Sequence, residues 1–162
     1  MAFKNAVLAV NPDLGAGEVI KQSPHNISAF DVFQDGLLAG RFAQLKAGVP
    51  SNMDGTATPK LIGIPRRKVT GEIASQSAYT LTSEGFDSVA EIINFGFATV
   101  EIADGAEPVK YGVVNVINEA ANAQNGRATD AAIAAGIISA GDMVFWEAKA
   151  AGVWLVRFNK YL

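Results

Sequence analysis

The sequence predicts an all-β protein, an antiparallel β-sandwich or jelly-roll-like barrel of about nine short strands with at most one short helix. Three observations predict this class. Short apolar and β-branched segments follow one another at roughly even spacing. Turn residues separate them, and the 162 residues include 16 Gly. Long helical segments of the kind that connect parallel strands are missing, which disfavours a parallel α/β sheet.

In the first half of the chain, the clearest strand candidate is Gly36–Lys46 (GLLAGRFAQLK), which begins at an Asp-Gly turn signal. Its apolar residues occupy both alternating faces, as in a strand covered on both sides. Proline and glycine in Gly48–Pro59 predict a loop, and Lys60–Ile64 predicts a short strand that ends at Pro65. Further candidates are short strands at Gly17–Gln22, Ser28–Phe33 and Lys68–Ile73, and an irregular stretch at Ala74–Asp87 anchored by Tyr79 and Leu81.

In the second half, Val89–Asn94 and Phe97–Ile102 are predicted strands on either side of Gly96. A glycine between two strands indicates a bulge or a tight corner. Tyr111–Asn118 is rich in β-branched residues and is also predicted to be a strand. The last two predicted strands, Asp142–Ala148 and Gly152–Lys160, form a terminal hairpin in which Trp154, Val156 and Phe158 share one face.

The stretch Glu119–Gly141 supports two interpretations. Its alanines favour a short helix over Asp130–Ala135, with Thr129 as the N-cap and Gly136 as the left-handed residue that ends it. A loop with a single helical turn fits the same residues. The sequence leaves this choice open.

Length and composition predict one domain over residues 13–162, preceded by an extended N-terminal arm over residues 1–12. A chain of this size buries roughly 68–70% of its unfolded surface, so it needs no covalent cross-links. It has no Cys, which excludes disulfides and thiolate metal sites. The net charge of -3 disfavours nucleic-acid binding, and no apolar run reaches the length of a membrane-spanning helix. We therefore expect neither nucleic acid nor a membrane as a partner.

The residues that usually carry catalysis are scarce. The single histidine, His25, follows Pro24 in a turn-like segment and lacks the neighbours of a catalytic base. The ligand sets of zinc and calcium sites and the usual phosphate-binding loops are missing. We therefore predict no enzymatic activity, no cofactor, no metal and no small-molecule substrate. One low-ranking alternative is a hydrolase in which two acids meet across strands, with the candidates Glu72, Glu91 and Glu101.

Four blocks, taken in order, resemble the capsid decoration, or structural cement, proteins of tailed bacteriophages. The resemblance extends over nearly the whole chain, although Gly105–Pro108 and the alanine-rich Glu119–Ala140 depart from the family pattern. The blocks are GLLAGRFAQL (36–45), LIGIPRRKVTGEI (61–73), SVAEIINFGFATVEIADGAEPVKYGVVNVI (88–117) and AGDMVFWEAKAAGVWLVRFN (140–159).

The resemblance implies a protein of the virion that is made in the host cytoplasm and sits on the outer surface of the phage head. There it would clamp adjacent copies of the major capsid protein and act as a homodimer or homotrimer. The arm would add as a strand to an exposed sheet edge of a neighbour. The candidate interaction residues are Phe3, Val7, Leu8 and Val10 in the arm and the basic cluster Arg66, Arg67 and Lys68.

A second hypothesis is a carbohydrate-binding or host-binding β-module of a phage fibre or adhesin. Its motivation is the sandwich-like pattern together with Trp146 and Trp154 at the terminal hairpin. An aromatic platform for a sugar requires exposed rings, so the exposure of these two side chains separates the two hypotheses.

Overall fold

The computed structural model of the protein describes residues 26–66, 80–82 and 89–159. The described residues form eleven strands and no helix, which confirms the all-β class. The strands are β1 (Asn26–Phe30), β2 (Leu37–Leu38), β3 (Ala43–Lys46), β4 (Val49–Asn52), β5 (Leu61–Pro65), β6 (Thr80–Leu81), β7 (Ala90–Glu101), β8 (Val113–Ile117), β9 (Ala128–Thr129), β10 (Ile137–Ala150) and β11 (Val153–Phe158).

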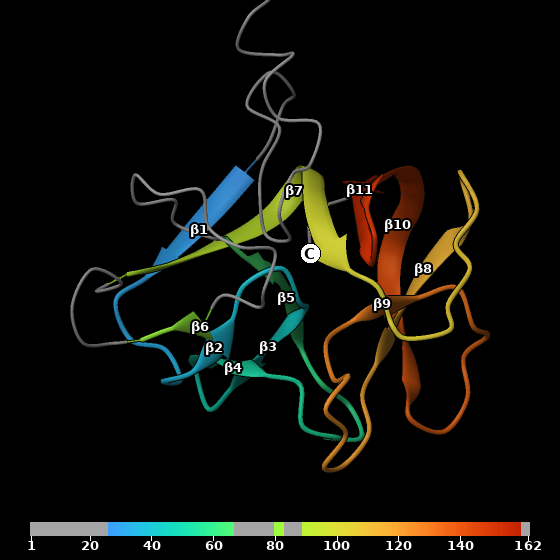
Figure 1. The fold of residues 1–162 in the computed structure, drawn as a ribbon. Coiled ribbons are helices and arrows are strands. Elements are labelled where there is room, and N and C mark those ends of the chain that lie inside the picture. Colours follow the sequence, from blue (N-terminus) through green and yellow to red (C-terminus); the bar gives the residue numbers. More distant parts are fainter. Residues whose placement is uncertain (1–25, 67–79, 83–88, 160–162) are drawn as a thin grey trace, which may run out of the picture.

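Nine of these strands make one curled antiparallel sheet (Figure 1). Its order is β4-β3-β5-β7-β11-β10-β8-β9, and β1 pairs with β7 beside this path. The remaining two strands, β2 and β6, form a small sheet of their own. The large sheet therefore has two halves, one containing β1, β3, β4 and β5 and the other containing β8 to β11, and β7 joins them.

Strand β7 connects the halves because its two ends pair with different strands. Its first part pairs with β1 and β5 through residues such as Ile92 and Ile93, and its second part pairs with β11 from Gly96 to Glu101. Gly96 lies at the change of partner with a φ of 95°. The predicted corner at this glycine is confirmed, and the two strands predicted around it are one continuous strand.

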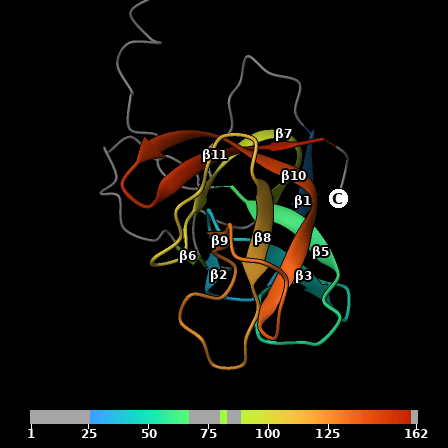
Figure 2. The ribbon, with the colours of Figure 1, turned by 90° about the vertical axis from the view of Figure 1, so that its right-hand side faces the viewer.

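The terminal hairpin also forms as predicted, and its first strand is longer than expected. Strand β10 begins at Ile137, pairs with β8, and then pairs with β11. Figure 2 looks onto this half, where β8, β10 and β11 lie together. Val156 and Phe158 are buried, and Trp154 packs against the same core cluster, so the predicted shared face is confirmed.

The described residues form two apolar cores, which lie on opposite faces of β5 and of the first part of β7. The larger joins residues of both halves, including Ile64, Ile93 and Phe145. The smaller lies beside the β2–β6 sheet and contains Ile92 and Leu81, the predicted anchor. Successive side chains of a strand point to opposite faces, so the neighbours Ile92 and Ile93 enter different cores. The sheet is therefore covered on both faces where β5 meets the first part of β7.

The predicted single strand Gly36–Lys46 is wrong, because the chain turns in its middle. It forms β2, then a turn at Ala39 and Gly40, and then β3. The Gly40 amide donates to the Pro65 carbonyl at 3.0 Å, and the Gly40 carbonyl accepts from the Glu101 amide at 2.8 Å. These bonds direct the backbone of Gly40 toward β5 and β7 instead of toward a continuing strand.

The predicted loop Gly48–Pro59 is also partly wrong, because its first residues form β4. A two-residue turn, Ala47 and Gly48, joins β3 to β4 with φ angles of 51° and 83°. Two positive φ angles are typical of the type I′ hairpin turn, which matches the twist of the paired strands. Pro50 is accommodated because β4 is an edge strand of the sheet.

Three side-chain hydrogen bonds to the carboxylate of Asp54 hold the end of this hairpin. The ammonium of Lys46, the hydroxyl of Thr56 and the side-chain amide of Gln44 all donate to Asp54. The Lys46 contact, with help from Thr56 and Gln44, holds the pKa of the Asp54 carboxyl well below its usual range.

The choice left open over Glu119–Gly141 is settled against a helix. The segment contains turns and β9, and only its last residues, from Ile137, enter β10. The Thr129 hydroxyl accepts a hydrogen bond from the Ala131 amide at 3.2 Å, as a capping residue does, but no helix follows. Gly136 takes the expected left-handed conformation, with a φ of 78°. The predicted strands Gly17–Gln22 and Lys68–Ile73 lie outside the described residues, as do the arm and most of Ala74–Asp87.

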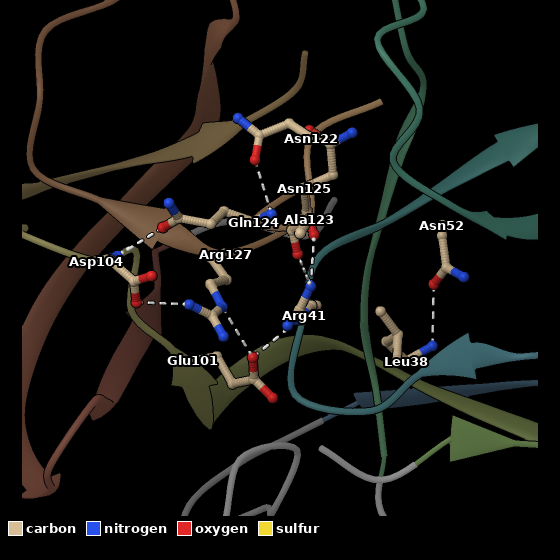
Figure 3. A network of polar contacts seen from close by, with 10 residues as sticks. All are labelled: Leu38, Arg41, Asn52, Glu101, Asp104, Asn122, Ala123, Gln124, Asn125 and Arg127. Carbon is tan, nitrogen blue, oxygen red and sulfur yellow. Dashed lines mark hydrogen bonds and ion pairs between the residues drawn. The ribbon is translucent and has the colours of Figure 1, made fainter. Parts of the chain in front are cut away.

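A charged network closes the junction between the two halves (Figure 3). Glu101, at the end of β7, accepts from the guanidinium of Arg41 at 2.8 Å and from that of Arg127 at 3.1 Å. Arg41 also donates to the backbone carbonyl of Ala123 at 2.7 Å. Arg127 reaches Asp104 at 2.8 Å. Three segments distant in sequence are thus held at one largely buried carboxylate, whose side chain is 14% exposed.

Strands β5 and β7 approach each other so closely that only glycine fits at Gly63. A Cβ at this position would lie 2.2 Å from the carbonyl oxygen of Ile93, and the φ of Gly63 is 129°. The backbone conformation and the contact therefore both exclude a side chain.

We expect Gly63→Ala to destabilise the protein by about 3–5 kcal/mol, because strain in the backbone and the clash with Ile93 add. The matched control is Gly48→Ala, since Gly48 also has a positive φ but has no atom within 4 Å of the position that a Cβ would take. The control should cost about 1 kcal/mol. Denaturant unfolding of both variants measures the difference, and equal costs would contradict the close approach.

We expect Glu101→Gln to lower the free energy of unfolding by about 3 kcal/mol, because the largely buried Arg41 loses its carboxylate and Arg127 keeps only the exposed Asp104. Glu147→Gln is the control, since the Glu147 side chain is 58% exposed where it pairs with Lys149. The control should change stability by at most about 0.5 kcal/mol. Urea midpoints that shift equally in the two variants would show that the network contributes nothing beyond a surface pair.

Candidate interaction surface

Exposed apolar side chains concentrate at one place on the described part of the molecule. Val109, Tyr111 and Val113 are 66%, 61% and 60% exposed, and alternate along the segment that leads into β8. The other large exposed apolar residues, Val32 and Ile133, lie elsewhere in the sequence. We call the region around this segment the Tyr111 surface. It consists of Phe97, Val109, Lys110, Tyr111, Val113, Trp146 and Arg157.

The sheet places part of this surface on the face opposite the larger core. Phe97, Arg157, Val144 and Val113 are consecutive partners across β7, β11, β10 and β8. Directly paired residues of antiparallel strands point to the same face. Their sequence neighbours, among them Val156, belong to the larger core, so this row points outward.

Trp146 is the centre of the surface. It lies at an irregularity in the pairing of β10 with β11, between Phe145 and Glu147. Its ring makes edge contacts with Phe97 at 5.3 Å and with Tyr111 at 5.4 Å between ring centroids. Such aromatic pairs contribute about 0.5–1.5 kcal/mol each beyond the area that they bury. The irregular pairing thus provides the indole against which the Tyr111 ring packs.

Backbone hydrogen bonds fix the segment that carries the exposed residues. The Tyr111 amide donates to the Phe145 carbonyl at 2.7 Å, and the Phe145 amide donates to the Gly112 carbonyl at 2.9 Å. Within the segment, the Gly112 amide donates to the Val109 carbonyl at 2.9 Å. The segment is therefore fastened to β10 directly below the exposed side chains.

The preceding loop is fastened at its start by the charged network. Asp104 accepts from Arg127, and its amide donates to the Gln124 side chain at 2.6 Å (Figure 3). Further along, the Glu107 amide donates to the Asp130 carboxylate at 3.3 Å. The loop from Ala103 to Gly112 thus has fixed points along its length.

Tyr111 itself is held in an unfavourable backbone conformation. Its φ is 67°, in the left-handed region that bulky residues rarely occupy. A strained residue of this kind costs about 1–3 kcal/mol and persists only where its surroundings determine it. The two hydrogen bonds to Phe145 supply that constraint and keep the Tyr111 ring on Trp146.

Two cations complete the surface. The Lys110 ammonium lies 5.3 Å, and the Arg157 guanidinium 5.1 Å, from the centroid of the Trp146 ring. Arg157 also donates to the side chain of Asn159. Neither cation has a carboxylate partner among the described residues, whereas Arg41, Lys46, Arg66, Arg127 and Lys149 each do.

Of the seven interaction residues predicted from the sequence, only Arg66 lies in the described part of the chain. Its guanidinium pairs with Glu91 at 2.7 Å, with both side chains about one third exposed. Phe3, Val7, Leu8, Val10, Arg67 and Lys68 lie outside the described residues, and so does His25. Their predicted role in interactions therefore stays a prediction.

The predicted meeting of two acids across neighbouring strands is wrong for Glu91 and Glu101. Both lie on β7, near its opposite ends, and each pairs with arginine instead of with another acid. Glu72 lies outside the described residues. In the described part of the chain, no three metal-ligating side chains come together, and no helix has the length and hydropathy to cross a membrane.

Sequence reasoning did not single out the Tyr111 surface. Val109 to Val113 precede and begin a β-branched run, and such a run indicates a buried strand whichever way its side chains point. The available signal was the pair Lys110-Tyr111 in front of Gly112, a charged residue and an aromatic residue beside a turn. Its proximity to Trp146 depends on the pairing of β8 with β10, which the sequence alone does not give.

The described residues thus form a curled antiparallel sheet with aromatic and cationic side chains gathered around Trp146. Comparison with known proteins identifies the family of the chain. The model of the XM1 gp53 minor capsid protein family matches residues 3–160, and the chain therefore belongs to this family. This confirms the expected relationship to capsid-associated proteins of bacteriophages.

A solved structure agrees with this assignment. A chain from the structure described as "The capsid of Myoviridae Phage XM1" is 53% identical to this one. The match covers 100% of both chains, with a TM-score of 0.84. A search of curated proteins found no match.

We expect Tyr111→Gly to be more stable than Tyr111→Val by about 1–2 kcal/mol. Both changes remove the ring contact with Trp146, but only glycine occupies a positive φ without strain, and a β-branched residue is especially unfavourable there. Thermal or denaturant unfolding of the two variants gives the comparison. Equal stabilities, or a more stable valine variant, would refute the strained conformation of Tyr111.

Proposed function

We propose that the protein is a capsid decoration protein, which binds the outer surface of the phage head and clamps adjacent major capsid protein subunits. The observation that carries this proposal is the full-length, 53% identical match to a chain from a phage capsid structure. Membership of a minor capsid protein family supports the same role. A protein that reinforces a shell must bind it without itself deforming.

The described scaffold is suited to that task. Strand β5 and the first part of β7 are covered on both faces, and the junction of the two halves is closed by the network around Glu101. Pulling the halves apart would break β7 pairings and expose two guanidinium groups at once. A closely packed fold of this kind has low compressibility and therefore transmits strain between its ends.

The proposal includes self-association as a homodimer or homotrimer, since decoration of a symmetric shell favours symmetric units. It also includes the arm, residues 1–12, as a strand that adds to an exposed sheet edge of a neighbour. Phe3, Val7, Leu8 and Val10 supply the apolar side chains for that contact. Arg66, Arg67 and Lys68 would supply basic groups.

The carbohydrate-binding alternative gains no support from the two tryptophans. Trp154 is partly buried and packs edge-on against Phe145, with 5.7 Å between ring centroids. Trp146 is also partly buried, and Lys110 and Arg157 lie over its ring. A sugar stacks on an open aromatic face, and the described geometry of neither ring offers one.

The direct test is reconstitution. Heads assembled without this protein are mixed with the purified chain, and binding is followed by co-sedimentation and electron microscopy. We expect saturable binding to assembled heads, added density on their outer surface, and greater resistance to rupture on heating or osmotic shock. Free major capsid protein subunits are the control and should bind much less. Absence of added density on undecorated heads would refute the decoration role.

The same assay includes a form that lacks Met1–Val10, which separates the arm from the domain. We expect weaker head binding with an unchanged unfolding midpoint. Unchanged affinity would refute the role of the arm while leaving the decoration role intact.

A further inference from the structure

We infer that the Tyr111 surface is the site at which the protein contacts the shell, and that it binds an acidic surface carrying an apolar side chain. This rests on the proposed decoration function and adds the chemistry of the partner. Carboxylates of the partner would pair with Lys110 and Arg157. The apolar side chain would pack on the exposed faces of Val109, Tyr111 and Val113.

The inferred negative charge of the partner follows from cations of this chain that have no carboxylate beside them. Among the described residues, only Lys60, Lys110 and Arg157 have no carboxylate partner within ion-pair distance. Two of these three lie over the same indole ring. In a chain with a net charge of -3, such a pair is a local exception. A negatively charged partner complements it, and complementary charges orient an encounter.

The apolar part of the surface points to protein as the partner. Tyrosine, tryptophan and arginine are the residues most enriched among those that dominate protein interfaces, and all three meet here. Exposure of apolar side chains to water does not stabilise the folded protein. Even so, Val109, Tyr111 and Val113 are all exposed within one short segment. Exposed apolar residues that gather in one short segment, instead of being scattered singly, favour an interaction site.

The strain at Tyr111 supports the same conclusion. Its positive φ is maintained by hydrogen bonds to Phe145, and these bonds hold the ring 61% exposed. Glycine would take this backbone conformation without strain. A strained residue that is over-determined by its surroundings is typical of a functional site, where it presents a side chain in a fixed pose.

A second copy of this chain related by two-fold symmetry fits the surface poorly. In a two-fold symmetric dimer, the same patch contacts itself, so Lys110 and Arg157 of both copies would lie close together. Like charges in such a position oppose association. The shell is therefore the better occupant, and self-association through this surface becomes an outcome that the experiment must distinguish.

The test measures the affinity of charge variants for undecorated heads. The variant carries Lys110→Glu together with Arg157→Gln, and the matched control is Lys60→Glu. Lys60 is exposed and has no carboxylate partner, but it lies before β5 in the other half of the sheet. We expect the double variant to bind at least about tenfold more weakly and the control to bind as the unmodified protein does. Unfolding midpoints establish that all three proteins are folded.

Ionic strength provides a second readout. Screening of exposed charges weakens their attraction, so the affinity of the unmodified protein should fall as NaCl rises. The double variant should lose most of that dependence, whereas Tyr111→Gly, which keeps both cations, should bind weakly and retain it. Tyr111→Gly remains a folded comparison because glycine accepts the backbone conformation at this position.

The outcomes separate the two proposals. If the unmodified protein binds heads and the double variant binds equally well, the Tyr111 surface is not the contact and the inference is overturned, while the decoration role stands. If the double variant instead loses its oligomeric state in light scattering and keeps head affinity per subunit, the surface joins copies of this chain and the inference is likewise overturned. If the unmodified protein does not bind heads, both proposals fail.

Discussion

Strand β7 must belong to both halves of the sheet at once, and most of the structure follows from this constraint. Its first part pairs with β1 and β5, and its second part pairs with β11. Its side chains enter two separate cores on opposite faces. Its last residue, Glu101, accepts from Arg41 and Arg127. A change that displaced β7 would therefore disturb both cores and the charged junction together.

The same strand also connects the scaffold to the exposed surface. Phe97 points outward from β7 to Trp146, while its neighbour Ala98 lies in the larger core. Tyr111 also contacts Trp146, from a loop whose start is held by the network around Glu101. The position of the exposed Tyr111 ring thus depends on contacts elsewhere in the fold. In the inferred contact with the shell, side chains that are already held in place would lose little conformational entropy on binding.

Local patterns explain what could be predicted from the sequence. The corner at Gly96, the terminal hairpin and the shared face of Val156 and Phe158 each depend on residues close together in the chain. Alternation and turn residues are sufficient for such features. The predictions were wrong where contacts between residues distant in sequence determine the local structure. The sequence alone predicts that Gly40 lies inside a strand. The turn at Gly40 is explained by its hydrogen bonds with Pro65 and Glu101, which are distant in sequence.

Pairing between strands explains the other differences between the predicted and the observed structure. Pro50 indicates a loop in isolation, but an edge strand tolerates it, and β4 is an edge only because of the order of the sheet. The Tyr111 surface was missed for a similar reason. The sequence of a β-branched run does not tell whether other elements of the fold cover one of its faces or both. Sequence gives the chemistry of Lys110, Trp146 and Arg157, and only the fold brings them together.

A decoration protein works by occupying repeated positions on a larger assembly. The most direct measurement of this role is the copy number of the chain relative to the major capsid protein in purified virions, determined by quantitative mass spectrometry. We expect a fixed ratio that matches a set of symmetry-related positions on the head and stays constant between preparations. A trace amount, or a ratio that varies from one preparation to another, would contradict the proposed role.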